Sequence, residues 1–200
     1  MKEPYLEKLL RRLRLRRIFP YIEKKDVVLD VGCGWEAKAL RALAPLIAKG
    51  YGMDLKVEKE DVPQNISLFD QRFEKQWPLQ DSSCDKAIML AVLEHIDPDQ
   101  VPVVLTNIHR HLKSDGRLIL TVPTPASQPL LEFLAYKLKI INEDEIRDHK
   151  VYYDNELLEK VLSENGFKII KYKRFQLGMN SFCVAEKQPT DAIGDHEERT

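Results

Sequence analysis

Two glycines separated by one residue, Gly32 and Gly34, follow an apolar run at residues 27–31 that carries a single acid, Asp30. An apolar strand that ends in a Gly-x-Gly turn and continues into a helix is typical of nucleotide-binding sites, because glycines let the backbone turn sharply and let a ligand approach the main chain. Asp54 follows Gly34 by 20 residues, at the end of the next expected strand, where a carboxylate can accept hydrogen bonds from both hydroxyls of a ribose. These residues therefore predict a site for an adenosine-containing ligand.

The same turn leaves two classes of ligand open. Read as G-x-G-x-x-A, the segment from Gly32 to Ala37 fits a permitted form of the dinucleotide fingerprint, which predicts an NAD-dependent oxidoreductase. Asp30 favours another ligand, because a carboxylate facing the site would repel a pyrophosphate but would attract the ammonium group of an amino-acid moiety. The Tyr-x-x-x-Lys pair formed by Tyr21 and Lys25 precedes the first strand, where it could not serve a hydride transfer.

Apolar runs and turn residues predict the elements that hold these side chains. Strands are expected at 27–31, 46–53, 66–69, 86–90 and 117–122, and helices at 3–18, 36–44, 57–61 and 98–112, with Asp97 as the N-cap of the last helix. Strands that alternate with helices form a parallel sheet covered on both faces. After residue 122 the pattern predicts an inserted helix at 127–140, a helix at 155–165 and two strands at 167–175 and 179–186, whose short connection requires an antiparallel hairpin.

The composition fits one domain with a sizeable core. The chain has 200 residues, 44% of them hydrophobic and 32% charged, and its net charge of -1 predicts no general attraction to nucleic acids or membranes. No apolar run reaches about 18 residues, and the N-terminus is too charged for a signal peptide, so a cytoplasmic protein is expected. Three cysteines without a Cys-x-x-Cys pattern argue against a disulfide framework and a zinc site, and no metal is expected.

Charge is uneven along the chain and indicates three parts. Residues 1–25 carry nine Lys or Arg against three Asp or Glu, and leucines at helical spacing form one apolar face of the helix at 3–18. We expect residues 1–22 to pack on the domain through these leucines, or to serve as a lid or as a patch for an anionic partner. Residues 23–187 form the ligand-binding domain, and the acidic tail at 188–200 is expected to be disordered because it lacks apolar periodicity.

Four segments resemble the motifs of the class I S-adenosylmethionine-dependent methyltransferases, in the small-molecule branch of that family. Residues 28–34 look like the first motif, residues 85–96 are similar to the strand-four motif, residues 112–118 resemble the turn into strand five, and residues 157–167 resemble the last helix and the strand after it. The resemblance implies an α/β, Rossmann-like doubly wound sheet, mostly parallel, with a C-terminal antiparallel hairpin and the strand order 3-2-1-4-5-7-6.

The resemblance also implies S-adenosylmethionine as the cofactor and gives each residue of the glycine turn a role. Gly32 and Gly34 would pass under the methionine part of the cofactor, and Cys33 would lie on the cofactor side as a small buried residue rather than as a nucleophile. Asp30 would lie near the amino group of the methionine part, with water between them. Glu36 stands where the family often has a third glycine, so the start of the helix is more crowded here.

Five further residues would complete the cofactor site that the resemblance implies. Asp54 would hold the ribose hydroxyls, with Leu55 beside the adenine. Asp70, after the third strand, would accept a hydrogen bond from the adenine amino group. Met89 and Leu90, at the end of the fourth strand, would line the methionine tail.

The expected reaction is a direct displacement that moves the methyl group to a small-molecule acceptor, so the protein mainly has to fix and align that acceptor. The N-terminal helix, the loop after the fourth strand and residues 124–150 are expected to form the acceptor pocket. His95 and then His149 are the candidate general bases, which are needed only where the acceptor loses a proton during attack.

Two other functions stay open beside methyl transfer. One is the NAD-dependent oxidoreductase, and the other is a non-catalytic cofactor-binding module that acts through a partner, with the arginine-rich helix as its interaction face. No nucleic-acid acceptor is expected, because the N-terminal helix is the one basic cluster of the sequence. The sequence does not distinguish a monomer from a homodimer.

Overall fold

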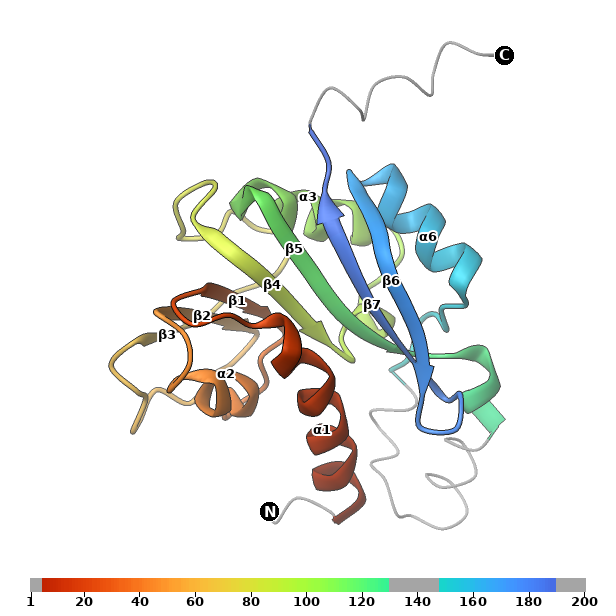
Figure 1. Cartoon of the computed structure of the whole chain (residues 1–200), viewed down its shortest axis with the longest axis horizontal. Coiled ribbons are helices and arrows are strands. Elements are labelled where there is room, and N and C mark those ends of the chain that lie inside the picture. The colour runs from red at the N-terminus through yellow and green to blue at the C-terminus, as the bar shows by residue number, and fades with distance from the viewer. Residues whose placement is uncertain (1–4, 130–147, 190–200) are drawn as a thin grey trace.

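The computed structural model describes residues 5–129 and 148–189 of the chain (Figure 1). Within them, seven strands form one sheet in the order β3-β2-β1-β4-β5-β7-β6, which confirms the predicted order. The strands are β1 (Val27–Val31), β2 (Lys49–Asp54), β3 (Ile66–Asp70), β4 (Cys84–Leu90), β5 (Leu112–Pro123), β6 (Phe167–Phe175) and β7 (Asn180–Lys187). The first five pair in parallel, whereas β7 pairs antiparallel with β5 and β6, so the predicted C-terminal hairpin is confirmed.

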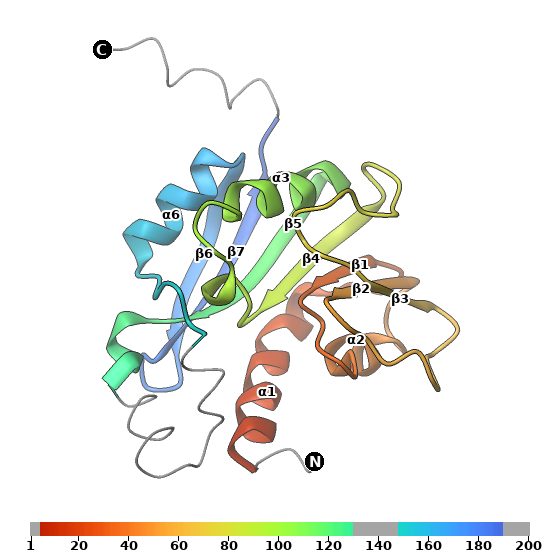
Figure 2. The ribbon, with the colours of Figure 1, turned by 180° about the vertical axis from the view of Figure 1, so that it is seen from behind.

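Helices cover both faces of the sheet (Figures 1 and 2). They are α1 (Tyr5–Ile18), α2 (Lys38–Leu43), α3 (Val101–His111) and α6 (Asn155–Glu164), with the 3-10 turns η1 (Phe19–Tyr21), η2 (Leu93–His95) and η3 (Pro125–Ser127). Buried side chains of α1 and α2 pack on one face, and those of α3 and α6 pack on the other. None of the described helices has the length and apolar character needed to cross a membrane.

The strands divide the hydrophobic core in two because successive residues of a strand point to opposite faces. In β5, Leu118 and Leu120 belong to the core under α3 and α6, whereas Ile119 belongs to the core under α1 and α2. In β1, Leu29 belongs to the core under α3 and α6, and Val28 belongs to the core under α1 and α2. The carboxyl ends of the parallel strands meet at one edge between these two layers, where open α/β sheets bind their ligands.

Element boundaries near the glycine turn differ from the predicted ones. α2 begins at Lys38, two residues later than predicted, because Ala37 has a left-handed backbone (φ 46°) and its N–H bonds to the Gly34 carbonyl at 3.1 Å. The helix predicted at 57–61 is wrong. An irregular loop lies there instead, and the Arg41 guanidinium donates hydrogen bonds to two of its carbonyl oxygens.

The start of α3 also corrects a prediction. The helix begins at Val101, three residues later than predicted, and Asp97 is not its N-cap. Gln100 takes that position without a side-chain hydrogen bond, and Asp97 contributes its backbone carbonyl, which accepts from the Gln100 N–H at 2.8 Å. The loop after β4 is therefore longer than the sequence indicates, and this leaves more backbone at the binding edge.

Four strands begin at other residues than predicted. β4 begins at Cys84, earlier than expected, and β7 begins at Asn180, one residue later than expected. β2 begins at Lys49, later than expected, and β5 begins at Leu112, earlier than expected, because Leu112 pairs with Cys84 of β4. The inserted helix predicted at 127–140 and the tail at 188–200 lie outside the described residues, apart from residues 127–129 and 188–189.

Candidate functional site

The turn after β1 has a backbone shape that glycine adopts far more easily than other residues. Gly32 and Gly34 have φ angles of +76° and +73°, in the left-handed region. A Cβ atom at Gly32 would also lie 2.4 Å from Cγ2 of Val92, whereas a Cβ atom at Gly34 would meet nothing within 4 Å. The Gly32 N–H donates to the Met53 carbonyl at 2.8 Å, which ties the turn to β2.

Asp54, at the end of β2, holds this turn from the other side. Its Oδ2 atom accepts from the Gly34 N–H at 2.8 Å, and its Oδ1 atom accepts from the Leu55 N–H at 2.7 Å. A carboxylate oxygen can accept more than one hydrogen bond, so both oxygens keep capacity for donors on a ligand. The spacing noted in the sequence thus has a structural basis, since Asp54 and the second glycine are in direct contact.

Asp30 is a buried acid that faces a cavity. Its side chain is 1% exposed, and its Oδ2 atom has no hydrogen-bond partner among the described residues. Burial, with a smaller contribution from the Asp54 charge, raises the pKa of Asp30 to about 8. A buried carboxyl without a partner is costly, and a cation or donor on a ligand would relieve that cost.

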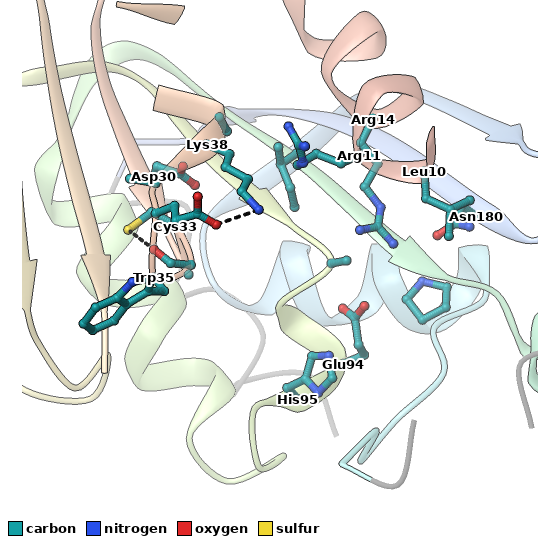
Figure 3. A pocket seen from close by; sticks show the side chains of 18 of the residues that line it. Leu10, Arg11, Arg14, Asp30, Cys33, Trp35, Lys38, Glu94, His95 and Asn180 are labelled. Atoms are coloured by element: carbon teal, nitrogen blue, oxygen red, sulfur yellow. Dashed lines mark hydrogen bonds and ion pairs between the residues drawn. The ribbon is translucent and has the colours of Figure 1, made fainter. Parts of the chain in front are cut away.

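Two adjoining cavities lie at the carboxyl ends of the parallel strands. The first cavity, of about 450 Å³, is lined by the glycine turn, the end of β4 and the α1 residues Arg11 and Arg14 (Figure 3). The second cavity, of about 1010 Å³, is lined by the ends of β2 and β4, the loop at 72–74 and the start of α3. Gly32, Ala91 and His95 line both cavities, so one elongated ligand can extend from the second into the first.

The structure brings most of the predicted site residues to these cavities. Asp30, Gly32, Cys33, Gly34, Leu90 and His149 line the first cavity, Asp54 and Leu55 line the second, and His95 lines both. Burial and the nearby carboxylates of Asp30 and Asp54 raise the pKa of the Cys33 thiol. The thiol therefore stays protonated, which does not suit a nucleophile.

Asp70 and Met89 line neither cavity. The Asp70 carboxylate is exposed, pairs with Lys59 and accepts from the Val57 N–H at 2.8 Å. Asp70 is thus engaged in holding the loop between β2 and β3. Met89 is fully buried in the core under α3 and α6, because alternation along β4 points its side chain to that face of the sheet and Leu90 to the other.

The fold brings His95 and His149 together from distant parts of the chain. His95 lies in η2, and His149 lies before α6, next to Asp148. Their ring centroids lie 4.7 Å apart in an edge-to-face arrangement. Nδ1 of His95 lies 3.2 Å from Oδ2 of Asp148, and Nδ1 of His149 lies 3.0 Å from the Tyr152 hydroxyl. Burial and the neighbouring His95 lower the pKa of His149 to about 4, so that ring is neutral near pH 7.

Several residues of the first cavity were missed in the sequence. The N-terminal helix was expected to help form the acceptor pocket, and its residues Arg11 and Arg14 line this cavity, although neither was named as a site residue; Asn180 was not considered. Glu94 is 1% exposed and lines the cavity, and burial raises its pKa to about 7. The sequence could have indicated Glu94 in the same way as Asp30, because both are acids within an apolar segment. Ala91, with φ of 58°, carried no signal because nothing in its type indicates a left-handed backbone.

A family model described as a methyltransferase domain matches residues 3–172 of the chain. A comparison with curated protein sequences found no match. Among solved structures, the fold is similar to that of the 1,6-didemethyltoxoflavin-N1-methyltransferase of Burkholderia thailandensis with bound 1,6-didemethyltoxoflavin and S-adenosylhomocysteine. The identity is 16%, the TM-score is 0.69, and the match covers 90% of this chain and 79% of that chain.

Two further structures have a similar fold. One is a methyltransferase of Haloferax volcanii in complex with a methyltransferase activator, at 16% identity and a TM-score of 0.68, covering 90% of this chain and 89% of that chain. The other is an S-adenosylmethionine-dependent methyltransferase of Methanosarcina mazei, at 18% identity and a TM-score of 0.63, covering 86% of this chain and 97% of that chain. At these identities the likeness concerns the fold.

Proposed function

The chain belongs to the methyltransferase-domain family, and we propose that it transfers the methyl group of S-adenosylmethionine to a small-molecule acceptor. The observation that carries the proposal is the pair of carboxyl groups beside the glycine turn. Asp30 is buried at one cavity, where its Oδ2 atom has no hydrogen-bond partner within residues 5–129 and 148–189, and Asp54 holds the turn at the other cavity. An adenosyl ligand with a positively charged amino-acid end has ribose hydroxyls for Asp54 and an ammonium group for Asp30.

The residues of the two cavities fit the parts of S-adenosylmethionine. In our proposal Asp54 accepts hydrogen bonds from the ribose hydroxyls, and Leu55 and Phe73 of the second cavity contact the adenine. The backbone at Gly32 gives the chain of the ligand room to pass into the first cavity, where Asp30 faces its ammonium group. When bound, the cofactor supplies a methyl group on a sulfonium, which is already activated for displacement.

The remainder of the first cavity is the proposed acceptor pocket. The whole first cavity has a volume of about 450 Å³, at the lower end of the range for small-molecule sites, and the amino-acid end of the cofactor would fill part of it, which favours a small acceptor over a macromolecule. Arg11 and Arg14 line it and favour an acceptor with a negative charge. His95 and His149 lie at its wall, where a neutral imidazole can accept a proton from the acceptor. These residues align the acceptor and exclude water, which contributes to catalysis through orientation.

Calorimetric titration with S-adenosylhomocysteine tests the cofactor part of the proposal. We expect the parent protein to bind it and to leave NAD unbound. Asp54→Ala should weaken binding about 100-fold, because two hydrogen bonds to a charged group are lost. Asp70→Ala is the matched control, since Asp70 stands opposite Asp54 in the register of β2 and β3 but lines neither cavity.

Two results would contradict this cofactor site: NAD binding without S-adenosylhomocysteine binding, or equal losses of affinity in the two variants. The acceptor part is tested separately with radiolabelled S-adenosylmethionine and a panel of small carboxylates and phenols. Label that moves into at least one small acid supports the proposal. Label that moves only into added protein or nucleic acid would overturn it, even where the cofactor binds.

A further inference from the structure

Glu94, His95 and His149 bring three potential metal ligands together at the wall of the first cavity. One ligand atom of each residue lies within 4.8 Å of the ligand atoms of the other two. Glu94 and His95 belong to η2, and His149 comes from the segment before α6, so the group is assembled by the fold. A tetrahedral zinc site needs ligand atoms about 3.4 Å apart, so binding a cation would require these atoms to move closer by at most about 1.4 Å.

Glu94 is the first independent sign that the group serves a ligand. Its side chain is 1% exposed, and its Oε2 atom has no hydrogen-bond partner among the described residues. A buried carboxylate oxygen in this state is costly unless something in the cavity pairs with it. Figure 3 shows the Glu94 carboxylate directed toward the space below α1, with His95 beside it.

The histidines are held in the way that metal-binding histidines are usually held. Nδ1 of His95 lies 3.2 Å from the Asp148 carboxylate, and Nδ1 of His149 lies 3.0 Å from the Tyr152 hydroxyl. When each Nδ1–H donates to its oxygen, the lone pair of each Nε2 is left for a cation. Carboxylate and hydroxyl partners of this kind fix the tautomer and the ring orientation of a ligating histidine.

The charged groups around the site allow a cation to bind. Arg14 lines the same cavity and lies close enough to Glu94 for its charge to be felt there, so it competes with a metal for this carboxylate. Asp148 adds a second negative charge and also pairs with Lys150 at 3.5 Å. A divalent cation carries twice the charge of Arg14 and can in addition take both imidazoles, which a guanidinium cannot.

We propose that Glu94, His95 and His149 bind a divalent transition-metal cation at the acceptor end of the first cavity. Two imidazoles and one carboxylate suit Zn²⁺ and its first-row neighbours, and three protein ligands leave a coordination position open. The open position takes an oxygen donor, so the acceptor class is a small acid or phenol with a hydroxyl or carboxylate that reaches the cation. This acceptor class rests on the proposed function, whereas the cation site does not. With a cation bound, His95 and His149 would serve as its ligands in place of the general-base role considered above.

Titration of the full chain, after treatment with a chelator, with Zn²⁺ tests the site by calorimetry. We expect one Zn²⁺ per chain. Glu94→Gln and His149→Gln should each weaken binding at least 100-fold, and Asp148→Asn should weaken it about tenfold, as expected for the partner of a ligand. His109→Gln is the matched control, because His109 lies outside the cluster and Gln keeps a donor for the Gln188 carbonyl.

Absence of stoichiometric Zn²⁺ binding to the parent would overturn the site, and so would parent-like affinity in both Glu94→Gln and His149→Gln. Glu94→Gln keeps the shape of a side chain whose Oε2 atom makes no hydrogen bond within the described residues, so it is expected to fold, and thermal unfolding of each variant checks this. S-adenosylhomocysteine binding is measured on the same samples. Zn²⁺ binding that fails while the nucleoside binds rejects the metal site alone, and the reverse result rejects the cofactor proposal alone.

Discussion

The two sides of the site that the two adjoining cavities form are built in different ways. The glycine-turn side, residues 30–37 with Asp54 and Leu55, comes from two adjacent strands and is held by backbone hydrogen bonds such as those from the N–H groups of Gly32 and Cys33 to the Met53 carbonyl. The acceptor side comes from α1, η2 and residues 148–152, which lie far apart in the chain. Backbone hydrogen bonds from Lys150 and Val151 to the Glu94 carbonyl join two of these segments, and side chains make the further contacts between them, such as that of His95 with Asp148.

This difference explains what each side can tolerate. Backbone hydrogen bonds and left-handed residues on the glycine-turn side leave few residue types that fit, so a substitution there disturbs the fold and the cofactor together. On the acceptor side a side chain can be exchanged without moving the main chain, so a substitution there changes what is bound. The predictions below test this contrast.

The largest effect is expected from Gly32→Ala. Alanine must adopt a φ of +76°, and its Cβ atom meets the Val92 side chain at 2.4 Å. We expect the free energy of unfolding to fall by about 3 kcal/mol, the sum of backbone strain and overpacking. Gly34→Ala should cost only about 1 kcal/mol, since its Cβ atom meets nothing within 4 Å. Denaturant unfolding measures both values.

Val92 provides the control for this prediction. It follows β4 and lies directly against Gly32, and Val92→Ala in the Gly32→Ala background should restore roughly the overpacking part of the loss, about 1 to 2 kcal/mol. Equal losses for the two glycine variants, without recovery in the double variant, would show that close approach to Val92 does not matter. The glycine turn would then be required for its backbone conformation alone.

The same contrast explains how much the sequence predicted. The seven strands follow from apolar periodicity, which is a local signal, whereas their order was expected from the resemblance to the methyltransferases. The spacing of Gly34 and Asp54 marked both residues as parts of one site, but their direct hydrogen bond was not predicted. Helix starts were less predictable. Ala37 has a left-handed backbone that its residue type does not indicate, so α2 begins later than the apolar pattern does.

The acceptor side was predicted only in part, because its geometry depends on contacts between distant segments. His95 and His149 were singled out by position, yet nothing in the sequence indicated that their rings meet at 4.7 Å or that Glu94 joins them. Asp70 shows the opposite case, because the sequence predicted it as a site residue and the structure places it outside both cavities. It ends β3 as Asp54 ends β2, but Lys59 and the Val57 N–H engage it outside both cavities.

A smaller effect is expected from Asp30→Asn, and it has opposite signs for binding and stability. The variant keeps the shape of the side chain but loses the charge that faces the proposed ammonium group, so S-adenosylhomocysteine affinity should fall about tenfold. Because burial raises the pKa of Asp30 to about 8, the folded state binds a proton that the unfolded state releases above its ordinary pKa near 3.8. The stability of the parent therefore falls as the pH rises from about 4 to about 8.

Thermal unfolding at pH 4 and pH 8 checks this sign. Asp30→Asn should be more stable than the parent at pH 8 and similar to it at pH 4, since the carboxyl group is protonated in the folded parent at pH 4. Binding should follow the charge as well: the affinity of the parent should rise between pH 6 and pH 8, and that of the variant should not. A variant less stable than the parent at pH 8 would contradict an unpaired buried carboxylate at this position.

The smallest effect is expected from Arg11→Gln, on the acceptor side. Arg11 lines the first cavity, whereas Arg12 is exposed on the same helix and does not, so Arg12→Gln is a control of the same residue type and helix. One partly exposed charge contributes roughly 0.5 to 1 kcal/mol, so the KM of an anionic acceptor should rise about threefold in Arg11→Gln. Steady-state kinetics should find kcat unchanged, and calorimetry should find the Kd of S-adenosylhomocysteine unchanged, because the glycine-turn side is intact. Equal shifts in KM for the two variants would mean that α1 acts through its overall field. A weaker Kd in Arg11→Gln would mean that the two sides are coupled, and the contrast drawn above would then fail.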